Sequence, residues 1–535
     1  MHKSYCLIGM FLVLSFCAFA QTSGEVTGMV TDPSGSAIPG SAITLTNTAT
    51  NATRTAESSG EGLYRFTPVP PGMYNLKVEH QGFKATNTAN IEVLVQQTVR
   101  LDLTLQVGQV TESVEVSASA ALLQAENATV GTVIENKAIV ELPLNGRNYL
   151  NLVNLAPNVN NLAPSSGQAG GRQGGDRAGQ AIAAGGNRVV FNYFTLDGVS
   201  NTDPNFNTYI VLPSIDALQE FKVQTGVYPA EFGHAATQIN VLTKSGGNAY
   251  HGSLFEFLRN DVVDASPYAF TAIRPVKPAF KWNDYGFELD GPVSIPKVFN
   301  GKDKLFFMTN YEALRQRQVT QGTYNVPTAA MFAGNFSQYG SIIHDPATKL
   351  PFQGNIIPAD RISPFSRSLL KYYNSATLPG LTNNYVQDNP SPMNQDRFIV
   401  RMDYLESAKS TWSGRYSWGD ENQSNQNINV SGTKVSTNYE QYMGSNTRIL
   451  TPNLVNETRF GYSRFYNALG TLSAFNTDVV SQLNLPNLPA GIPVTWGIPS
   501  VNMQGNGFSA FGDVTDGPFE NNNNTAQLIN SSVRL

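Results

Sequence analysis

Apolar and polar residues alternate along several stretches of the first hundred residues. Tyr74, Leu76 and Val78 alternate with polar neighbours, and the apolar positions between Val99 and Val107 do the same. A period of two is typical of strands that bury one face, and turn-forming residues separate the stretches. The pattern therefore predicts a small antiparallel β-sandwich over residues 21–107.

A second alternating region lies beyond residue 248. Near residue 400 the apolar and the charged side chains fall on opposite faces of one strand, with Phe398, Val400, Met402 and Tyr404 against Arg397, Arg401 and Asp403. In the next strand Trp412, Gly414, Tyr416 and Trp418 alternate with Thr411, Ser413, Arg415 and Ser417. This is the apolar-out, polar-in pattern of strands in outer-membrane barrels.

Loop lengths separate a membrane barrel from a soluble sandwich, because both have strands of the same period. Strands are predicted near residues 249–259, 281–291, 304–315, 396–405, 409–418, 438–449, 454–466 and 524–533. Their connections are in turn long, short, long, short, medium, short and long. Outer-membrane barrels have short turns on one side and long loops on the other, so the order of connections favours the barrel.

Residues 119–247 show no long alternation. Short apolar runs are broken by turn residues, among them Asp197-Gly198, Pro204 and Pro213. This pattern predicts short strands and tight turns in a loop-rich α+β region. No nucleophile elbow or phosphate-binding loop occurs in it.

The N-terminus is typical of a secretory signal over residues 1–20. Lys3 precedes an apolar stretch from Leu7 to Phe16, and Ala18-Phe19-Ala20 forms a cleavage site. A lipoprotein site at Cys17 is the alternative. Because both cysteines lie within these residues, cleavage after Ala20 leaves a mature chain without a disulfide or a thiolate metal site.

Composition excludes further classes of function. Charged residues make up 14% of the chain and the net charge is −5, so no basic face for a nucleic acid is expected. After the N-terminus no apolar run approaches the roughly 20 residues of a membrane-spanning helix. The histidines His80, His234, His251 and His344 are scattered, and the motifs of zinc proteases and serine hydrolases are absent. We therefore expect neither an enzyme nor a cofactor or metal site.

Ordered sequence motifs resemble those of one family. EFKVQTGVYPAEFG, INVLTKSGGN and HGSLFEFLRND, between residues 220 and 261, resemble the end of the plug domain and the first barrel strand of TonB-dependent outer-membrane receptors, in particular the Oar-like branch. GMVTDPSGSAIPGSAITLTN at residues 28–47 resembles the carboxypeptidase regulatory-like domain, which has a carbohydrate-binding-like fold. The resemblance implies a mainly β chain with a sandwich at 21–107, a linker at 108–118, an α+β plug at 119–247 and an incomplete transmembrane antiparallel β-barrel at 248–535.

Two sets of candidate site residues follow from this resemblance. The linker residues Glu112, Ser113, Val114, Glu115, Val116, Ser117 and Ala118 are similar to a TonB box, although by themselves they are only a strand end or a linker. In the family such a segment pairs as an added strand with a TonB-type energy-coupling protein in the periplasm. The plug residues Glu220, Gly226, Gly233, Lys244 and Gly246 match motif positions, and turns explain the glycines equally well.

The resemblance implies a receptor in the outer membrane, in contact with its lipid, with the N-terminal domain in the periplasm. Such a receptor takes up a small ligand that is scarce or bulky, such as an iron chelate, an oligosaccharide or a peptide, by energy-coupled movement of the plug. The alternative is a surface protein for adhesion or matrix organisation that transports nothing. Only about eight strands are counted, whereas about twenty-two surround a plugged lumen. We therefore expect an N-terminal fragment of a longer receptor, with open edges at strands 249–259 and 524–533.

Overall fold

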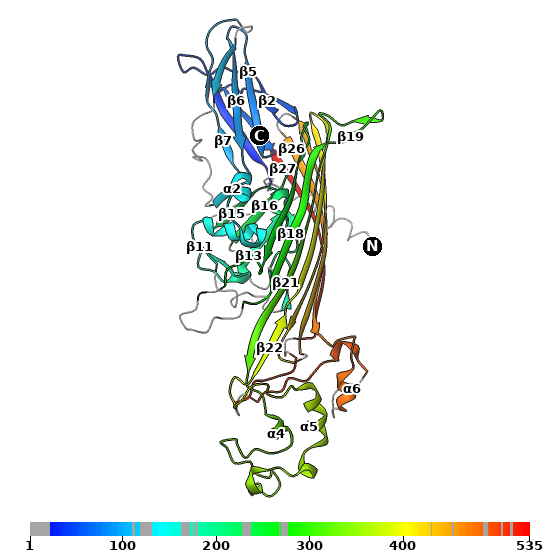
Figure 1. Ribbon diagram of the computed structural model, residues 1–535. Helices are drawn as coiled ribbons and strands as arrows, with labels where there is room; N and C mark the ends of the chain where they lie inside the picture. The colour runs from blue at the N-terminus through cyan, green and yellow to red at the C-terminus, as the bar shows by residue number, and fades with distance from the viewer. Residues whose placement is uncertain are drawn as a thin grey trace, which may run out of the picture.

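The computed structural model describes residues 22–109, 113–117, 131–161, 172–174, 177, 180–226, 237–266, 268, 277–429, 431–451, 454–484, 491–503, 507–513 and 517–534. Three β assemblies follow one another along the chain: a sandwich, a plug and a tall curved wall (Figure 1). The plug lies against one face of the wall, and the sandwich lies at one end of it (Figure 1). The expectation of a mainly β chain is confirmed.

The sandwich consists of two sheets with a shared apolar core. One sheet has the order β4-β1-β7, with β8 also paired to β1, and contains β1 (Gly24–Thr31), β4 (Leu63–Val69), β7 (Thr98–Arg100) and β8 (Leu103–Thr104). The other has the order β3-β2-β5-β6-β9 and contains β2 (Ala42–Asn47), β3 (Thr53–Glu57), β5 (Gly72–Glu79), β6 (Ala85–Val93) and β9 (Ser113–Ser117). Alternating residues such as Val26, Ile43 and Leu76 fill the core. The expected antiparallel pairing is wrong in part, because β1 pairs in parallel with β7 and β8, and β6 pairs in parallel with β9.

The plug is a five-stranded mixed sheet with short helices around it. Its order is β10-β15-β16-β13-β14, formed by β10 (Gly131–Glu135), β13 (Asn192–Leu196), β14 (Val199–Ser200), β15 (Leu218–Thr225) and β16 (Thr237–Thr243). The other elements are α2 (Asn136–Glu141), η1 (Asn145–Arg147), η2 (Tyr149–Leu155), η5 (Val189–Phe191), η6 (Ile215–Ala217) and the pair β11 (Val159–Asn161) and β12 (Ile182–Ala184). Tyr149, Phe194 and Phe221 are fully buried in its core. Short elements in this region agree with the turn-rich sequence.

The wall is an antiparallel sheet in which each long strand pairs with the next one along the chain. Its strands are β17 (His251–Asn260), β18 (Phe280–Pro292), β21 (Leu305–Tyr324), β23 (Met393–Ser407), β24 (Ser410–Gln426), β25 (Gly432–Thr451), β26 (Leu454–Thr471) and β27 (Phe519–Arg534), with β22 (Tyr385–Pro390) paired to β21. All eight strands expected from the sequence are present, and most are longer than expected. In the described part of the chain the sheet is open, with β17 and β27 at its edges.

The two faces of the wall differ as the alternation predicted. Arg397, Asp403 and Arg415 are buried beneath the plug, whereas Met402 and Trp412 on the opposite face are 44% and 47% exposed. The charged side chains therefore point toward the plug, and the apolar and aromatic ones point away from it. This is the distribution of a sheet with lipid on one side and a filled interior on the other.

The long connections of the wall gather at the end opposite the sandwich (Figure 1). Their short elements are α4 (Ala329–Phe332), η8 (Gln353–Asn355), η9 (Ala359–Arg361), α5 (Pro364–Leu369), η10 (Leu370–Tyr372), α6 (Val479–Leu483) and η11 (Pro493–Thr495), while the hairpin of β19 (Ser294–Ile295) and β20 (Phe299–Asn300) lies at the sandwich end. The connection after β21 and the connection after β26 pack on each other through Tyr373 and Phe511, whose ring centroids are 4.2 Å apart. Nowhere in the described ranges does a helix have both the length and the apolar character to cross a membrane.

Candidate functional site: the contact between plug and wall

The plug presents a tight hairpin to the wall. Asp197 and Gly198 connect β13 to β14, and Leu196 pairs with Val199 across the turn. The backbone φ angles are +49° at Asp197 and +74° at Gly198. Two consecutive residues with positive φ are the signature of a type I′ hairpin, for which Asp-Gly is a preferred sequence. The sequence thus builds a sharp tip with a carboxylate on it.

Five consecutive wall strands each contribute one side chain to this tip. In chain order they are Arg401 from β23, Arg415 from β24, Gln441 from β25, Arg459 from β26 and Gln527 from β27. We call the tip, residues 196–200, together with these five side chains the plug clasp. Neighbouring strands of a sheet place equivalent inward positions side by side. A row of long polar side chains on one face can therefore surround a single turn.

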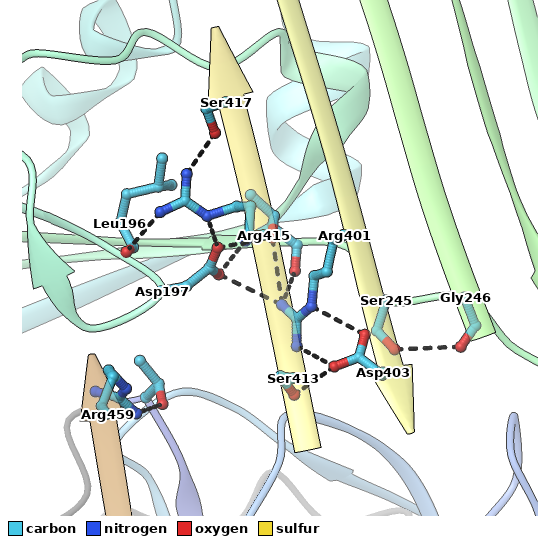
Figure 2. A network of polar contacts seen from close by, with 12 residues as sticks. Leu196, Asp197, Ser245, Gly246, Arg401, Asp403, Ser413, Arg415, Ser417 and Arg459 are labelled. Atoms are coloured by element: carbon cyan, nitrogen blue, oxygen red, sulfur yellow. Dashed lines mark hydrogen bonds and ion pairs between the residues drawn. The ribbon is translucent and has the colours of Figure 1, made fainter. Parts of the chain in front are cut away.

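Asp197 is the acidic centre of the plug clasp (Figure 2). Its carboxylate is 2.7 Å from the Arg415 Nε and 3.4 Å from a terminal nitrogen of Arg401. It also accepts hydrogen bonds of 2.9 Å from the backbone N–H and from the hydroxyl of Thr243. Burial acts to raise the pKa of Asp197, but Arg415, Arg401 and Thr243 outweigh it and hold the pKa below its usual value. Asp197 is therefore ionised at neutral pH.

Arg401 and Arg415 extend the plug clasp in different directions (Figure 2). Arg401 donates to the Thr243 carbonyl at 3.0 Å and forms a two-nitrogen pair with Asp403 at 2.9 and 3.0 Å. Arg415 donates to Gln441 at 2.7 Å, and Gln441 in turn donates to the Ser200 carbonyl at 3.0 Å. The two arginines thus join the hairpin tip, the end of β16 and the wall into one polar network.

Gly198 allows the wall to approach the tip closely. A Cβ atom built on Gly198 would lie 1.8 Å from a terminal nitrogen of Arg459. Arg459 donates to the Gly198 carbonyl at 3.3 Å. Two features therefore favour glycine at position 198: its positive φ and the Arg459 guanidinium, which occupies the space that a Cβ would need.

A second contact lies at Arg177, a fully buried plug residue. Its guanidinium is 2.8 Å from Glu421 of β24 and donates to the Ile210 carbonyl at 2.8 Å. It also lies 4.8 Å from the ring centre of Tyr209 and 5.5 Å from that of Tyr439. Buried charges are tolerated when they are paired and hydrogen-bonded, and Arg177 meets both conditions.

A third contact joins the helical part of the plug to the first strands of the wall. Arg147 in η1 pairs with Asp216 and lies 3.5 Å from Glu312 of β21. Glu312 also accepts a 2.5 Å hydrogen bond from the Ser214 hydroxyl. The Arg147 guanidinium stands 4.0 Å from the ring centre of Phe255 in β17. The plug is thus held by charge pairs to β21, β23 and β24 of the wall.

Glu220, one of the candidate plug residues, faces the sandwich instead of the wall. Its carboxylate accepts a 2.6 Å hydrogen bond from the backbone N–H of Val95. The pKa of Glu220 is raised to about 7, chiefly by burial and also by the carboxylates of Glu135 and Glu92, while the Val95 hydrogen bond and the charge of Lys222 act to lower it. Lys222 donates to the Gln96 carbonyl at 3.2 Å, and burial lowers its pKa to about 8.

The other candidate plug residues lie apart from one another. Gly226 ends β15 with a φ of +102° and open space around its Cα. Gly246 is packed between wall strands, because a Cβ there would lie 2.4 Å from the Phe307 carbonyl oxygen. The backbone N–H of Lys244 donates to Ala217 at 2.8 Å. Gly233 lies outside the described residues, so the candidates that are described form no single site.

The TonB-box-like segment is a strand of the sandwich. Ser113, Val114, Glu115, Val116 and Ser117 form β9, which pairs with residues 85–89 of β6. Glu112 and Ala118 lie outside the described residues. The segment therefore has an extended backbone, as strand addition to a partner requires.

The plug clasp was not among the candidate sites, although the sequence carried two signals for it. Asp197-Gly198 is a turn sequence, and alternation places Arg401 and Arg415 on the polar face of their strands. Only the fold brings them together, since Arg401 and Asp197 are 204 positions apart in sequence. The plug clasp joins the plug to the wall through ion pairs and hydrogen bonds. In the part of the chain that the structure covers, no group of three or more His, Cys, Asp or Glu residues could bind a metal ion.

Comparisons with known proteins agree with this architecture. Residues 242–533 match the family model of the outer membrane beta barrel domain, and residues 25–106 match that of the carboxypeptidase regulatory-like domain. The TonB-dependent transporter Oar of Myxococcus xanthus is 27% identical over 326 residues, which are 58% of this chain. The chain spans 28% of the length of that relative.

Solved structures that match parts of this chain include outer-membrane proteins. The outer membrane transporter YddB of Escherichia coli is 12% identical, with a TM-score of 0.42 over 64% of this chain and 40% of its own. The siderophore receptor PirA of Acinetobacter baumannii is 14% identical, with a TM-score of 0.35 over 63% of this chain and 40% of its own. Since the barrel family model covers more than half of the sequence, the chain belongs to the outer membrane β-barrel family, and its sequence is similar to that of a TonB-dependent transporter.

Proposed function

We propose that the protein is a TonB-dependent outer-membrane receptor, which takes up a scarce or bulky ligand by energy-coupled movement of its plug. The plug clasp is the observation that carries this proposal. A plug that must move needs an interface whose contacts can be exchanged for water. Hydrogen bonds and ion pairs can be replaced by bonds to water molecules, whereas exposing an apolar core costs free energy in proportion to its area.

In the plug clasp, contacts with five wall strands meet at one small element of the plug, the β13–β14 hairpin. Asp197, Gly198 and Ser200 lie within one hairpin, so a small displacement of β13 and β14 would break the contacts with several wall strands together. Packed interfaces respond to such displacements by switching between discrete arrangements. We propose that ligand binding and a pull on the plug combine to displace this hairpin.

The two ends of the wall differ in the length of their connections, and this difference indicates which end faces the periplasm. The short β23–β24 turn, the end of β25 and the start of β26 lie at the sandwich end, whereas the long connections gather at the other. In outer-membrane barrels the short turns face the periplasm. We therefore assign the sandwich, exported by a signal peptide at residues 1–20, to the periplasm and the connections around Tyr373 and Phe511 to the cell exterior.

The ligand belongs to the classes too large or too scarce for porins: iron chelates, oligosaccharides or peptides. The two long connections bring aromatic side chains together at the proposed outer end, where Tyr339 stacks on Phe508 at 5.7 Å between ring centres. Because Phe508 is buried, this stacking holds the two connections against each other. A TonB-type coupling protein in the periplasm would be the second partner.

The test uses the natural gene in the source cells and a proline in the TonB-box-like segment. Cells are grown in a medium with defined iron chelates, oligosaccharides and peptides, and mass spectrometry follows the depletion of each. We expect V116P to abolish the depletion of at least one class, as deletion of the gene does, because proline removes an amide that strand addition requires. Val116→Thr retains this amide and the β-branched shape, so it is the matched control and should behave as the wild type.

One outcome of the same experiment would contradict energy-coupled transport. If V116P cells and the wild type deplete every class at equal rates, the segment does not couple energy to uptake. The alternative function, surface adhesion or matrix organisation without transport, would then account for the sandwich and the polar loops. Loss of cell adhesion on deletion of the gene, with unchanged adhesion in V116P, would support that alternative.

A further inference from the structure

A short hairpin projects from the wall between β18 and β21. It consists of the paired strands β19 and β20. At its tip the Val298 N–H donates to the Ile295 carbonyl at 3.0 Å, and Lys297 has a φ of +64°. Proline at the second position of a turn, here Pro296, and a positive φ at the third are typical of a type II turn. The sequence therefore builds a defined hairpin at this place.

The base of the hairpin is closed tightly. The Val293 N–H donates to the Leu305 carbonyl, and the Leu305 N–H donates to the Gly301 carbonyl, both at 2.8 Å. A Cβ on Gly301 would lie 2.3 Å from the Val293 carbonyl oxygen, so a side chain at this position would collide with the closure. Figure 1 shows the hairpin extending from the wall on the side opposite the plug.

The hairpin leaves the wall at one boundary of its outward apolar face. On β23 the outward residue Met402 is followed by Tyr404 and then by the exposed Glu406. Leu305 at the hairpin base is the register partner of Tyr404, which is in turn the partner of Trp412. The exposed Trp412 donates from its Nε1 to Glu406 at 3.0 Å. An aromatic ring with a hydrogen-bonding edge is typical of the membrane–water interface, so the hairpin base lies at interfacial level.

Apolar side chains dominate the surface of the hairpin. Every residue from β19 to β20 is exposed. Ile295 is 51% exposed, Val298 78% and Phe299 37%, and Lys297 lies between the first two. Neighbouring exposed apolar groups indicate contact with a protein or a membrane. Apolar residues beside a cation are typical of elements that lie in the headgroup region of a membrane.

The charge in and beside the hairpin is mainly positive. Three exposed lysines lie there: Lys297, Lys302 and Lys304. Between residues 293 and 305 the sequence has one carboxylate, Asp303. It accepts hydrogen bonds from the side chains of Asn51 and Asn248 at 2.9 and 2.6 Å. Anionic lipids attract lysines close to a membrane surface, so an anionic surface complements this hairpin.

We infer that this hairpin is a membrane-surface anchor: Ile295, Val298 and Phe299 enter the phospholipid layer at the periplasmic boundary of the membrane, while the neighbouring lysines pair with anionic headgroups. Transfer of apolar side chains from water to lipid is favourable in proportion to the area buried. A soluble protein partner is less suited to this place, because the hairpin emerges on the lipid-facing side of the wall, level with Trp412. The anchor requires the wall to lie in a membrane, and it does not depend on transport.

Fluorescence quenching in vesicles tests the anchor. The natural receptor carries an environment-sensitive dye at V298C and is reconstituted into vesicles of phosphatidylethanolamine and phosphatidylglycerol, with spin labels high on the acyl chains as quenchers. Residues 21–535 contain no cysteine, so within them the dye is specific for the introduced thiol. V107C on the sandwich is the matched control, because Val107 is a valine with 71% exposure. M402C on the outward face of the wall is the reference for a residue in lipid.

The inference predicts a specific order of quenching. We expect quenching at V298C to lie within about twofold of that at M402C and to exceed that at V107C by about fivefold or more, because interfacial elements lie among the upper acyl chains. Quenching at V298C no stronger than at V107C would overturn the anchor and leave the hairpin open to a protein partner. If M402C is unquenched as well, the wall does not lie in lipid, and the anchor fails together with the proposed location.

The lysines are tested by placing the spin label on one lipid at a time. We expect labelled phosphatidylglycerol to quench V298C about twofold more than labelled phosphatidylethanolamine, and K297Q/K302Q to bring this ratio to about one. The control K349Q/K371Q removes the same charge from the connection after β21 and should keep the ratio of the parent protein. A ratio that K297Q/K302Q leaves unchanged would overturn the pairing with anionic headgroups.

Discussion

The plug has two kinds of interface, and they differ in the chemistry that holds them. Toward the wall, Asp197, Arg415 and Arg177 are buried and take part in ion pairs with several hydrogen bonds each. Toward the sandwich, single hydrogen bonds reach backbone groups of residues 95 and 96 from Glu220 and Lys222. The pKa of each of these two side chains is displaced toward neutrality by burial.

This difference indicates which interface separates first. Breaking a buried ion pair by removing one partner costs about 3–5 kcal/mol, because the other charge is left without compensation. A single hydrogen bond contributes about 0.5–1.5 kcal/mol. The plug makes several buried ion pairs with the wall but single hydrogen bonds with the sandwich, so we expect it to separate from the sandwich before it separates from the wall.

The largest effect is expected from removal of the acidic centre of the plug clasp. Asp197→Ala leaves Arg415 and Arg401 buried without their shared carboxylate, so the free energy of unfolding should fall by about 3–5 kcal/mol. Urea denaturation in detergent micelles measures this change. The control is Asp102→Ala, because the Asp102–Arg100 pair is exposed and should contribute less than about 1 kcal/mol. Equal effects of the two changes would show that the plug clasp does not hold the plug.

Gly198→Ala should be the next most destabilising change. Alanine at this position has both an unfavourable φ of +74° and a Cβ that collides with Arg459. We expect a loss of about 2–3 kcal/mol in the free energy of unfolding. Gly226→Ala isolates the backbone contribution, since its φ is +102° and nothing lies within 4 Å of the added Cβ. If both variants lose the same free energy, close approach of the wall at Gly198 is unimportant.

These residues also show how far the sequence could predict the molecule. The strands of the wall and their two faces were predictable, because alternation is a local pattern that the neighbours of each residue reveal. Asp197-Gly198 was predictable as a turn for the same reason. The pairing of Asp197 with Arg415 was not, because it depends on the register of the wall strands and on how the plug sits against them.

The pairing of β9 illustrates a second limit. Five residues of alternating character fit an edge strand or a linker equally well, and nothing in them specifies β6 as the partner or a parallel direction. Glu220 matched a plug motif by resemblance, but its contact with Val95 arises between two separate domains. In both cases the missing information is the relative position of folded units, which a local pattern does not contain.

The contact between plug and sandwich should depend on pH through Glu220. Its folded pKa of about 7 is above the ordinary value of 4.5, so the folded state holds the proton more tightly than the unfolded state does. The stabilisation is therefore complete below pH 4.5 and is lost as the pH rises to about 7, by on the order of 2–3 kcal/mol. Unfolding of the wild type and of Glu220→Gln is compared at pH 5 and pH 7.5. A fall in stability that is equally large in both proteins would assign the pH dependence to other groups.

Lys222 sets the upper limit of this pH range. Its folded pKa of about 8 is below the ordinary value of 10.5, so its contribution is present above pH 10.5 and is lost as the pH falls to about 8. The contribution of the two groups to the free energy of unfolding is therefore smallest between about pH 7 and pH 8.

The smallest effect is expected where the sandwich touches the wall. Asn51 of the sandwich donates a side-chain hydrogen bond of 2.9 Å to Asp303 in exposed surroundings. Asn51→Gly should lower the free energy of unfolding by less than about 1 kcal/mol, because glycine tolerates the φ of +56° at this position and water replaces an exposed hydrogen bond. Limited proteolysis should nevertheless release the sandwich faster, since local separation is governed by few contacts. If the variant resists proteolysis as well as the wild type does, the sandwich is held by its contact with the plug, and Glu220→Gln would then be the change that alters its release.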